Sequence, residues 1–269
     1  MKNIINGVNL QSVANVIIDQ DRKDSLQNLP DKSIIWCKTD YLGNLFQELK
    51  QYKNKNFVLI SHCSDHSITE KVFNHKPKCI SKWFAQNVDY KHPDLIPIPI
   101  GVENHFTLNK GSYTNFSVLE NNVFDFKIKN KIINKLYSNF GNTHPSRNLV
   151  RNILLKNNIG IQDPRVNYEQ YTARIKEFLF VASPRGNGID THRTWESLYF
   201  GCIPIVEKHF MFDEYKELPI IQITDWDQVN TDFLKPYIEQ YKKGSCFKQT
   251  EKLNLNYWLT TIQETSKNI

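Results

Sequence analysis

One stretch in the second half of the chain, SPRGNGIDTHRTWE (residues 183–196), concentrates side chains that bind anionic ligands. Arginine makes bidentate contacts to phosphate, and glycine allows the backbone to approach a ligand closely. A carboxylate one to two turns into a helix, here Glu196, can accept two hydrogen bonds from the hydroxyls of a ribose. Together these groups describe a site for a nucleoside diphosphate. The candidate ligand-binding residues are Ser183, Arg185, Gly186, Asn187, Gly188, Asp190, Thr191, His192, Arg193 and Glu196.

Strand and helix patterns on both sides of this stretch predict its place in a fold. The run FLFVA (178–182) predicts a buried strand, and we expect a helix over 191–200 with Asp190 or Thr191 as its N-cap. The free N–H groups at the start of such a helix bind anions. A second buried strand is expected over 203–206. The site therefore belongs at the carboxyl end of a parallel sheet, where α/β proteins bind nucleotides.

The same helix divides its side chains between a core and a ligand. Trp195, Leu198 and Tyr199 recur at helical spacing and are expected to pack inward, which leaves Glu196 on a different face. In an alternative interpretation, Arg185 and Glu196 form a surface ion pair and the glycines only turn the chain.

Short apolar runs alternate with helical stretches along the whole chain, which predicts the α/β class with parallel sheets. In the first half we expect strands over 33–37, 56–61 and 79–85, helices over 41–50 and 68–73, and an extended segment over 95–100. In the second half we expect a strand within 131–140, helices over 146–156 and 168–176, a strand over 220–223, and a helix at the C-terminal end. The polar segment 104–122 divides two lobes, 1–115 and 116–269, and the last helix can pack back on the first lobe.

Composition narrows the class of protein. The chain has 269 residues, of which 40% are hydrophobic and 23% charged, so it can bury a core and is not a disordered protein. Five cysteines do not form a disulfide framework, and no apolar run approaches the ~18 residues of a membrane span. The first 20 residues lack a signal-peptide pattern, so we expect a cytoplasmic protein. The net charge of +6 favours acidic partners without choosing among them.

The segment SPRGNGIDTHRTWESLYFGCIPIV (183–206) resembles the donor-binding motif of exostosin-like glycosyltransferases. WFAQNV (83–88) and IPIGVEN (98–104) are similar to small bacterial, phage and giant-virus members of that group. The resemblance implies a GT-B fold, with two Rossmann-like lobes, a cleft between them, and a nucleotide-sugar held mainly by the second lobe. It also implies that Arg185 contacts the diphosphate and Glu196 the ribose, and that Arg193 lies beside them. Members are generally inverting and often need no metal.

An inverting transfer needs a general base that deprotonates the acceptor hydroxyl. The loop SHCSDH follows the strand expected over 56–61 and so lies at a carboxyl end of the first sheet. Asp65 in this loop is the first candidate base, and His62 and His66 are the second. Asp65 could instead cap the following helix, as Asp40 is expected to cap the helix over 41–50. Further candidates for contacts with the sugar or acceptor are Asp40, Gly101, Glu103 and Asn104.

Metal sites are not favoured. The His, Cys and Asp residues between 62 and 79 match no zinc spacing. Asp225-Trp-Asp227 is a DxD sequence that could bind a divalent ion, but it starts a predicted helix, where aspartate is a common cap. Cys202 is expected to be a buried structural thiol. We therefore expect no metal ligands and no required cofactor, with a UDP-sugar as the donor substrate.

Two hypotheses concern the acceptor of the sugar, and further ones replace sugar transfer by another function. The leading hypothesis for the acceptor is a glycan or a lipid-linked glycan, which allows a protein peripheral to a membrane, in the host cytoplasm if it is viral. A second hypothesis is DNA with hydroxymethylated bases, since the net charge suits a phosphate backbone. A third is a nicotinamide enzyme with Glu207 on the ribose, although SPRGNG departs from the GxGxxG pattern. A module that only binds nucleic acid is disfavoured, because the positive charge is not clustered.

Overall fold

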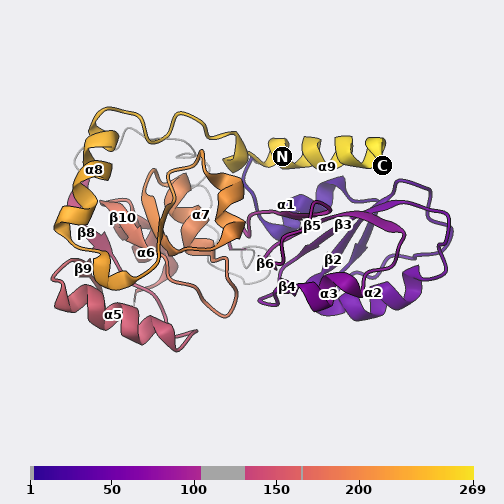
Figure 1. Ribbon diagram of the computed structural model, residues 1–269, viewed down its shortest axis with the longest axis horizontal. Coiled ribbons are helices and arrows are strands. Elements are labelled where there is room, and N and C mark those ends of the chain that lie inside the picture. Colours follow the sequence, from indigo (N-terminus) through magenta and orange to yellow (C-terminus); the bar gives the residue numbers. More distant parts are fainter. Residues whose placement is uncertain (1–2, 104–130, 165) are drawn as a thin grey trace.

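The computed structural model describes residues 3–103, 131–164 and 166–269, which form two lobes (Figure 1). In this part of the chain, each lobe is built on a sheet of five parallel strands. The prediction of an α/β protein with parallel sheets is therefore confirmed. The predicted lobe boundary at 115 and 116 and the polar segment 104–122 lie outside the described residues.

The strands of the first sheet follow the order of the chain, β1-β2-β3-β5-β7. These strands are β1 (Val16–Ile18), β2 (Ile34–Lys38), β3 (Phe57–His62), β5 (Ile80–Ala85) and β7 (Leu95–Pro97). A short parallel pair, β4 (Ile68–Thr69) and β6 (Val88–Asp89), lies beside it. Helices α2 and α3 lie on one face of this sheet, and α1 and the last helix, α9, lie on the other (Figure 1). The helices are α1 (Gly7–Leu10), α2 (Leu42–Leu49), α3 (Glu70–Asn74) and α9 (Leu255–Asn268), with 3₁₀ turns η1 (Gln11–Val13) and η2 (Thr39–Tyr41).

The second sheet reverses its strand order, β12-β11-β10-β8-β9. Its strands are β8 (Ile132–Tyr137), β9 (Gly160–Ile161), β10 (Phe178–Ala182), β11 (Ile203–Glu207) and β12 (Ile221–Ile223). The helices of this lobe are α5 (Ser146–Lys156), α6 (Tyr168–Ile175), α7 (His192–Tyr199) and α8 (Thr231–Lys242), with 3₁₀ turns η5 (Phe210–Tyr215), η6 (Trp226–Gln228) and η7 (Glu251–Leu253). The chain leaves β8 for β9 on one side and reaches β10 on the other, and a crevice opens where such a parallel sheet changes direction.

Helix α2 shows how local sequence sets these elements. Its buried residues Leu42, Leu45, Phe46 and Leu49 recur at helical spacing and face the first sheet. The helix begins at Leu42 rather than at residue 41, because the 3₁₀ turn η2 occupies the preceding three residues. Asp40 lies inside that turn, so its prediction as the N-cap of this helix is wrong.

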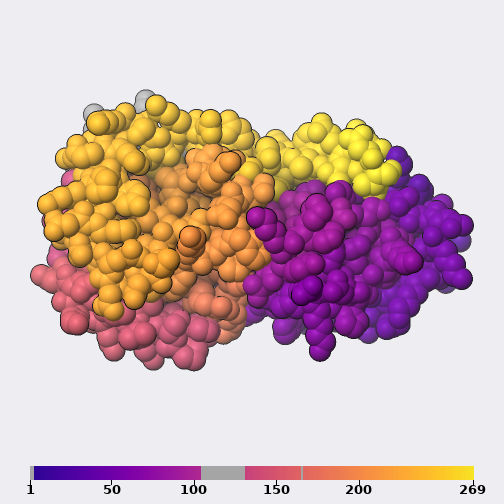
Figure 2. Space-filling view, viewed as in Figure 1, coloured from indigo at the N-terminus to yellow at the C-terminus, as the bar shows by residue number. Residues whose placement is uncertain are grey.

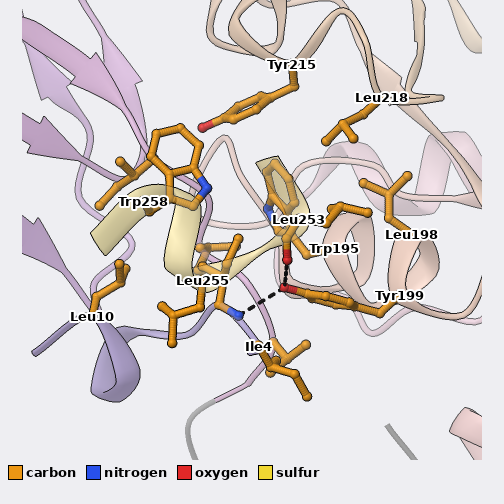
Figure 3. Packing of buried hydrophobic residues seen from close by; sticks show 14 of the residues in the cluster. Ile4, Leu10, Trp195, Leu198, Tyr199, Tyr215, Leu218, Leu253, Leu255 and Trp258 are labelled. Carbon is orange, nitrogen blue, oxygen red and sulfur yellow. Dashed lines mark hydrogen bonds between the residues drawn. The ribbon is translucent and has the colours of Figure 1, made fainter. Parts of the chain in front are cut away.

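Buried apolar side chains of the described residues form three clusters. One lies between the first sheet and α2 and α3, and another between the second sheet and α5 and α8. The largest is continuous across both lobes, and Figure 3 shows how side chains of α7, η5, α9 and the N-terminal segment meet there. Trp195 packs edge-on against Tyr215, and Tyr215 against Trp258 of α9. The lobes are therefore joined by a shared core.

Helix α9 extends this core by crossing from the second lobe to the first, where it lies along the surface (Figure 2). It packs against β3 and α1. Near its end, the Lys32 ammonium donates to the carbonyl of Lys267 over 2.7 Å, and the Ser266 hydroxyl donates to the carbonyl of Lys32. The C-terminal helix thus covers a face of the N-terminal sheet.

Two tyrosines of the shared core provide a test of its polar contacts. The buried Tyr199 hydroxyl donates to the Leu253 carbonyl over 2.7 Å and accepts from the Ile5 N–H over 3.0 Å (Figure 3). We expect Tyr199→Phe to lower the free energy of unfolding by about 2 kcal/mol. The reason is that the Leu253 carbonyl and the Ile5 N–H, both buried, lose the hydroxyl with which they pair. The matched control is Tyr215→Phe, since the buried Tyr215 hydroxyl has no hydrogen-bond partner in the described chain. Urea unfolding of both variants measures the difference, and equal losses would contradict the prediction.

Candidate functional site

A cavity of about 670 Å³ lies at the carboxyl ends of β8 and β10, where the second sheet reverses its strand order. Its walls come from the loop after β8, the start of α6, the loop after β10 with α7, and the first lobe. The lining residues are Asn139, Phe140, Gly141, Thr143, Arg147, Val166, Asn167, Tyr168, Tyr171, Gly186, Asn187, Gly188, Asp190, Thr191, His192, Arg193, Glu196, Asp65, Ile100 and Glu103. We call it the inter-lobe cavity.

Glu196 supplies a buried carboxylate to the wall of this cavity. Its Oε1 accepts from the Tyr168 hydroxyl and its Oε2 from the Tyr171 hydroxyl, each over 3.2 Å. The two tyrosines are three residues apart on α6 and so share a face, and Asn167 fixes the start of that helix with a capping box. Burial raises the pKa of the Glu196 carboxyl. Because Glu196 is buried, the alternative of a surface ion pair with Arg185 is wrong.

Two arginines bring positive charge to the cavity, and each is the second residue of a helix that begins there. Arg193 of α7 donates to the Asn139 carbonyl over 2.8 Å and lies over the rings of Phe140 and Tyr171. Its buried Nε has no hydrogen-bond partner in the described part of the chain. Arg147 of α5 is also buried, and burial lowers its pKa to about 10, which leaves it charged at neutral pH.

Arg147 joins the two loops that form this end of the cavity. Its Nε donates to the carbonyl of Arg185 over 2.8 Å, and its Nη2 to that of Pro184 over 3.1 Å. Its Nη1 donates to the carbonyl of Gly141 over 3.0 Å, in the loop after β8. A Cβ at Gly186 would lie 3.2 Å from Arg147 Nη2, so the glycine leaves room for the guanidinium.

Arg185, the predicted phosphate ligand, does not line the cavity. Its backbone N–H donates to Glu207 Oε2 over 2.9 Å, and its guanidinium reaches the nearby carbonyls of Gly186 and Asn187. The other oxygen of Glu207 accepts from Trp226 Nε1 over 2.8 Å. Glu207 therefore orders the loop, and its carboxylate does not face the cavity as the nicotinamide hypothesis required.

Asp190 joins the lobes, because its carboxylate accepts hydrogen bonds from groups of the protein itself. Its Oδ2 accepts from the Ile100 N–H of the first lobe over 2.8 Å, and both oxygens lie 2.8 Å from Trp195 Nε1. Burial raises the pKa of Asp190 to about 6. The N-cap of α7 is Thr191, one of the two predicted candidates, although its side chain makes no capping bond. The Ser183 hydroxyl is also turned inward, 2.9 Å from that of Thr191.

Two glycines that were expected near a ligand, Gly188 and Gly101, lie where backbone or side chains pack closely between the lobes. A Cβ at Gly188 would lie 2.7 Å from the amide of Asn87, which accepts from the Asp190 N–H over 2.8 Å. Gly101 has a φ of +69°, and a Cβ there would lie 2.1 Å from the Ile5 carbonyl. Its own carbonyl accepts from His192 Nδ1 over 2.8 Å.

The candidate bases of the first lobe lie in different places. Asp65 lines the inter-lobe cavity, and its Oδ2 accepts from Asn187 Nδ2 over 3.1 Å, so it faces the predicted donor loop. Glu103 also lines this cavity, whereas Asn104 lies outside the described residues. Asp40 and His66 line a different cavity, where His66 Nε2 is 3.9 Å from Asp40 Oδ1.

His62 is fully buried at the end of β3 and does not line the cavity, so it is not placed to act as a base. Its Nε2 donates to the Pro99 carbonyl over 3.0 Å, and burial lowers its pKa to about 4. Between pH 4 or so and the ordinary histidine pKa, His62 is protonated in the unfolded chain but neutral in the folded chain. We therefore expect the free energy of unfolding to fall by about 2 kcal/mol between pH 7 and pH 5. His62→Gln keeps a donor but cannot titrate, so urea unfolding at both pH values should lose this difference; an equal difference in the variant would contradict it.

Two further predictions are confirmed. Asp225 is the N-cap of η6, where its Oδ1 accepts from the Asp227 N–H over 2.9 Å, so the DxD sequence is used as a cap. Cys202 is a buried thiol, 3.3 Å from Lys131 Nζ, and burial raises its pKa.

Among the residues in the three described ranges, no helix is both long and apolar enough to cross a membrane.

Comparison with known proteins adds no assignment. No model of a known protein family matches the chain, and no curated protein matches it.

The inter-lobe cavity therefore combines three chemical functions. The starts of α5 and α7, with Arg147 and Arg193, can bind an anion. Glu196 can accept hydrogen bonds from a diol beside that anion. Asp65 lies on the opposite lobe as a carboxylate able to take a proton.

Proposed function

We propose that this chain transfers a sugar from a nucleoside-diphosphate sugar, with UDP-sugars as the leading donors, to an acceptor hydroxyl. The observation that carries the proposal is the inter-lobe cavity, which has an anion-binding end, a buried carboxylate and a facing aspartate. Two lobes with parallel sheets and the sequence resemblance to exostosin-like glycosyltransferases support a GT-B fold. The proposed setting is the cytoplasm or the cytoplasmic surface of a membrane.

The diphosphate is assigned to the point where the second sheet changes direction. The strands on either side of this point, β8 and β10, are each followed by a helix whose second residue is an arginine, Arg147 or Arg193. Helix N-termini carry partial positive charge, and guanidinium groups bind phosphate oxygens in pairs. Glu196 lies one turn further along α7, where it can accept from ribose hydroxyls.

The proposed reaction inverts the anomeric centre. Asp65 takes the proton from the acceptor hydroxyl while that oxygen forms a bond to the anomeric carbon. The bond from the anomeric carbon to the diphosphate oxygen breaks, and its electron pair leaves with the nucleoside diphosphate. Arg147, Arg193 and the two helix N-termini stabilise the charge that develops on the departing diphosphate.

A thermal-shift screen of the purified protein against UDP, GDP, CDP, their common sugar conjugates and NAD(H) tests the donor. A ligand at 100 times its Kd adds about 2.7 kcal/mol to the free energy of unfolding, which gives a measurable rise in Tm. We expect a rise with one nucleoside diphosphate and its sugar conjugates. A rise with NAD(H) alone, or with none of the ligands, would contradict the proposal.

Removal of divalent metal should leave donor binding and transfer unchanged. The reason is that Arg147, Arg193 and the helix N-termini supply positive charge where a metal ion would otherwise neutralise the diphosphate. The measurement is UDP affinity and transfer rate with excess EDTA and with added Mn²⁺ or Mg²⁺. Loss of activity in EDTA that Mn²⁺ or Mg²⁺ restores would contradict this prediction.

A further inference from the structure

A second cavity, of about 740 Å³, lies in the first lobe between α2 and the segment that contains β4 and α3. Both helices are on the face of the sheet opposite α9 (Figure 1). Asp40 follows β2 and His66 follows β3, so this cavity also opens near carboxyl ends of parallel strands. None of its lining residues contributes to the inter-lobe cavity. We call it the α2–α3 cavity.

The side chains of the α2–α3 cavity are of two kinds. Leu42, Phe46 and Ile68 are buried residues that contribute an apolar lining, and the Phe46 ring is held edge-on against Trp83 at 5.6 Å between centroids. The charged and titratable lining residues are Lys50, Lys71, His66, His75 and Asp40. Two lysines and two histidines therefore outnumber the single carboxylate in this lining.

One loop of the first lobe contributes to both cavities. Asp65 and His66 are consecutive, yet Asp65 lines the inter-lobe cavity and His66 lines the α2–α3 cavity. The loop that holds them is fixed by polar contacts: the Cys63 N–H donates to Gln86 Oε1 over 2.8 Å, and Asn87 Nδ2 donates to the Ser64 carbonyl over 3.0 Å. The loop that carries the proposed base therefore also contributes to the α2–α3 cavity.

We propose that the α2–α3 cavity binds the acceptor, and that the acceptor is a phosphate-bearing lipid with a sugar hydroxyl to be glycosylated. The hydrocarbon chain contacts the apolar lining, and Lys50, Lys71 and His66 contact the phosphate. The sugar then reaches across the loop to Asp65. This inference rests on the proposed function and specifies its substrate class. A free glycan would leave the apolar lining without a partner, and free phosphate would use only the lysines and histidines.

Dodecyl phosphate, below its micelle concentration, is the probe, and calorimetry measures its binding to the full chain. We expect saturable binding that is at least about tenfold tighter than that of dodecanol or of inorganic phosphate. The double variant Lys50→Glu with Lys71→Glu should weaken the binding at least about tenfold. Its matched control is Lys53→Glu with Lys78→Glu, which reverses two exposed lysines of the same lobe outside the cavity. Val72→Trp, which fills the cavity, should also weaken binding.

Several results would overturn the inference. They are absence of binding, equal binding by the two double variants, and an affinity matched by dodecanol or by inorganic phosphate. UDP binding, measured on the same samples by thermal shift, separates this inference from the proposed function. UDP binding without dodecyl phosphate binding refutes the lipid acceptor alone, whereas dodecyl phosphate binding without any nucleotide binding refutes the transferase. Unchanged UDP binding in the double variant also shows that it folds.

Discussion

Replacement of Asp65 by asparagine is expected to slow glycosyl transfer by roughly 10²–10⁴-fold. Asparagine has the same shape but cannot take the proton of the acceptor hydroxyl. Asp65 is exposed in the wall of the inter-lobe cavity, where its carboxylate accepts a hydrogen bond from the side chain of Asn187 in the facing loop. Donor binding should stay within about twofold, because the diphosphate and ribose sites belong to the other lobe. The measurements are single-turnover transfer with a UDP-sugar and UDP affinity by calorimetry.

Asp89→Asn is the matched control for this variant. Asp89 is also an exposed aspartate of the first lobe with a partner on the second, His209, whose Nε2 lies 3.2 Å from its Oδ1. It does not line the inter-lobe cavity, so the control should keep full activity. Full transfer by the Asp65 variant would exclude Asp65 as the base and would point to Glu103, which also lines the cavity from the first lobe.

The sequence predicted the parallel sheets well because apolar runs such as FLFVA are long enough to mark buried strands. It did not reveal β1 or β9, which have three residues and two. A run that short carries no periodicity. The position of β9 nonetheless matters, because its pairing beside β8 creates the change of direction at which the inter-lobe cavity opens.

The sequence predicted many of the cavity-lining residues within one continuous stretch, but it missed those that come from separate stretches. Glu196 and Arg193 were predicted because their helix directly follows the Gly/Pro loop in the sequence. Arg147, Tyr168 and Tyr171 were missed, since they come from α5 and α6 and only the tertiary fold brings them to the cavity. Arg147 did carry a signal: it begins a helix after β8 in the same way that Arg193 begins one after β10.

The three candidates in the loop after β3 show how far a single residue can shift a prediction. The strand was expected to end at residue 61 but extends through His62, which is therefore buried with the other residues of β3. Asp65 and His66 then line different cavities, although they are neighbours in sequence. Residue type pointed to this loop, but strand length and side-chain direction decide which of its members lines the inter-lobe cavity.

Glu196→Gln is expected to weaken UDP binding by about 100-fold, which corresponds to about 2.7 kcal/mol. The Glu196 carboxylate holds one tyrosine hydroxyl on each oxygen, and its remaining lone pairs are available to two ribose hydroxyls. Glutamine loses the charge and presents donors to one of those hydroxyls. Its carbonyl still accepts from one tyrosine, so the variant should fold. Glu177→Gln, an exposed glutamate of the same lobe, is the control.

Two measurements distinguish a ribose contact from a general loss of shape. Removal of both ribose hydroxyls, as in 2′,3′-dideoxy-UDP, should weaken binding to the native protein but cause little further loss in the Glu196 variant, because the same contact is already gone. Burial raises the pKa of Glu196, so the native protein should also lose UDP affinity on acidification at a higher pH than an exposed glutamate would. The glutamine variant should lack that dependence. Unchanged UDP affinity in the variant, or equal losses from the dideoxy ligand in both proteins, would refute the ribose assignment while leaving the diphosphate site at Arg147 and Arg193 to be tested separately.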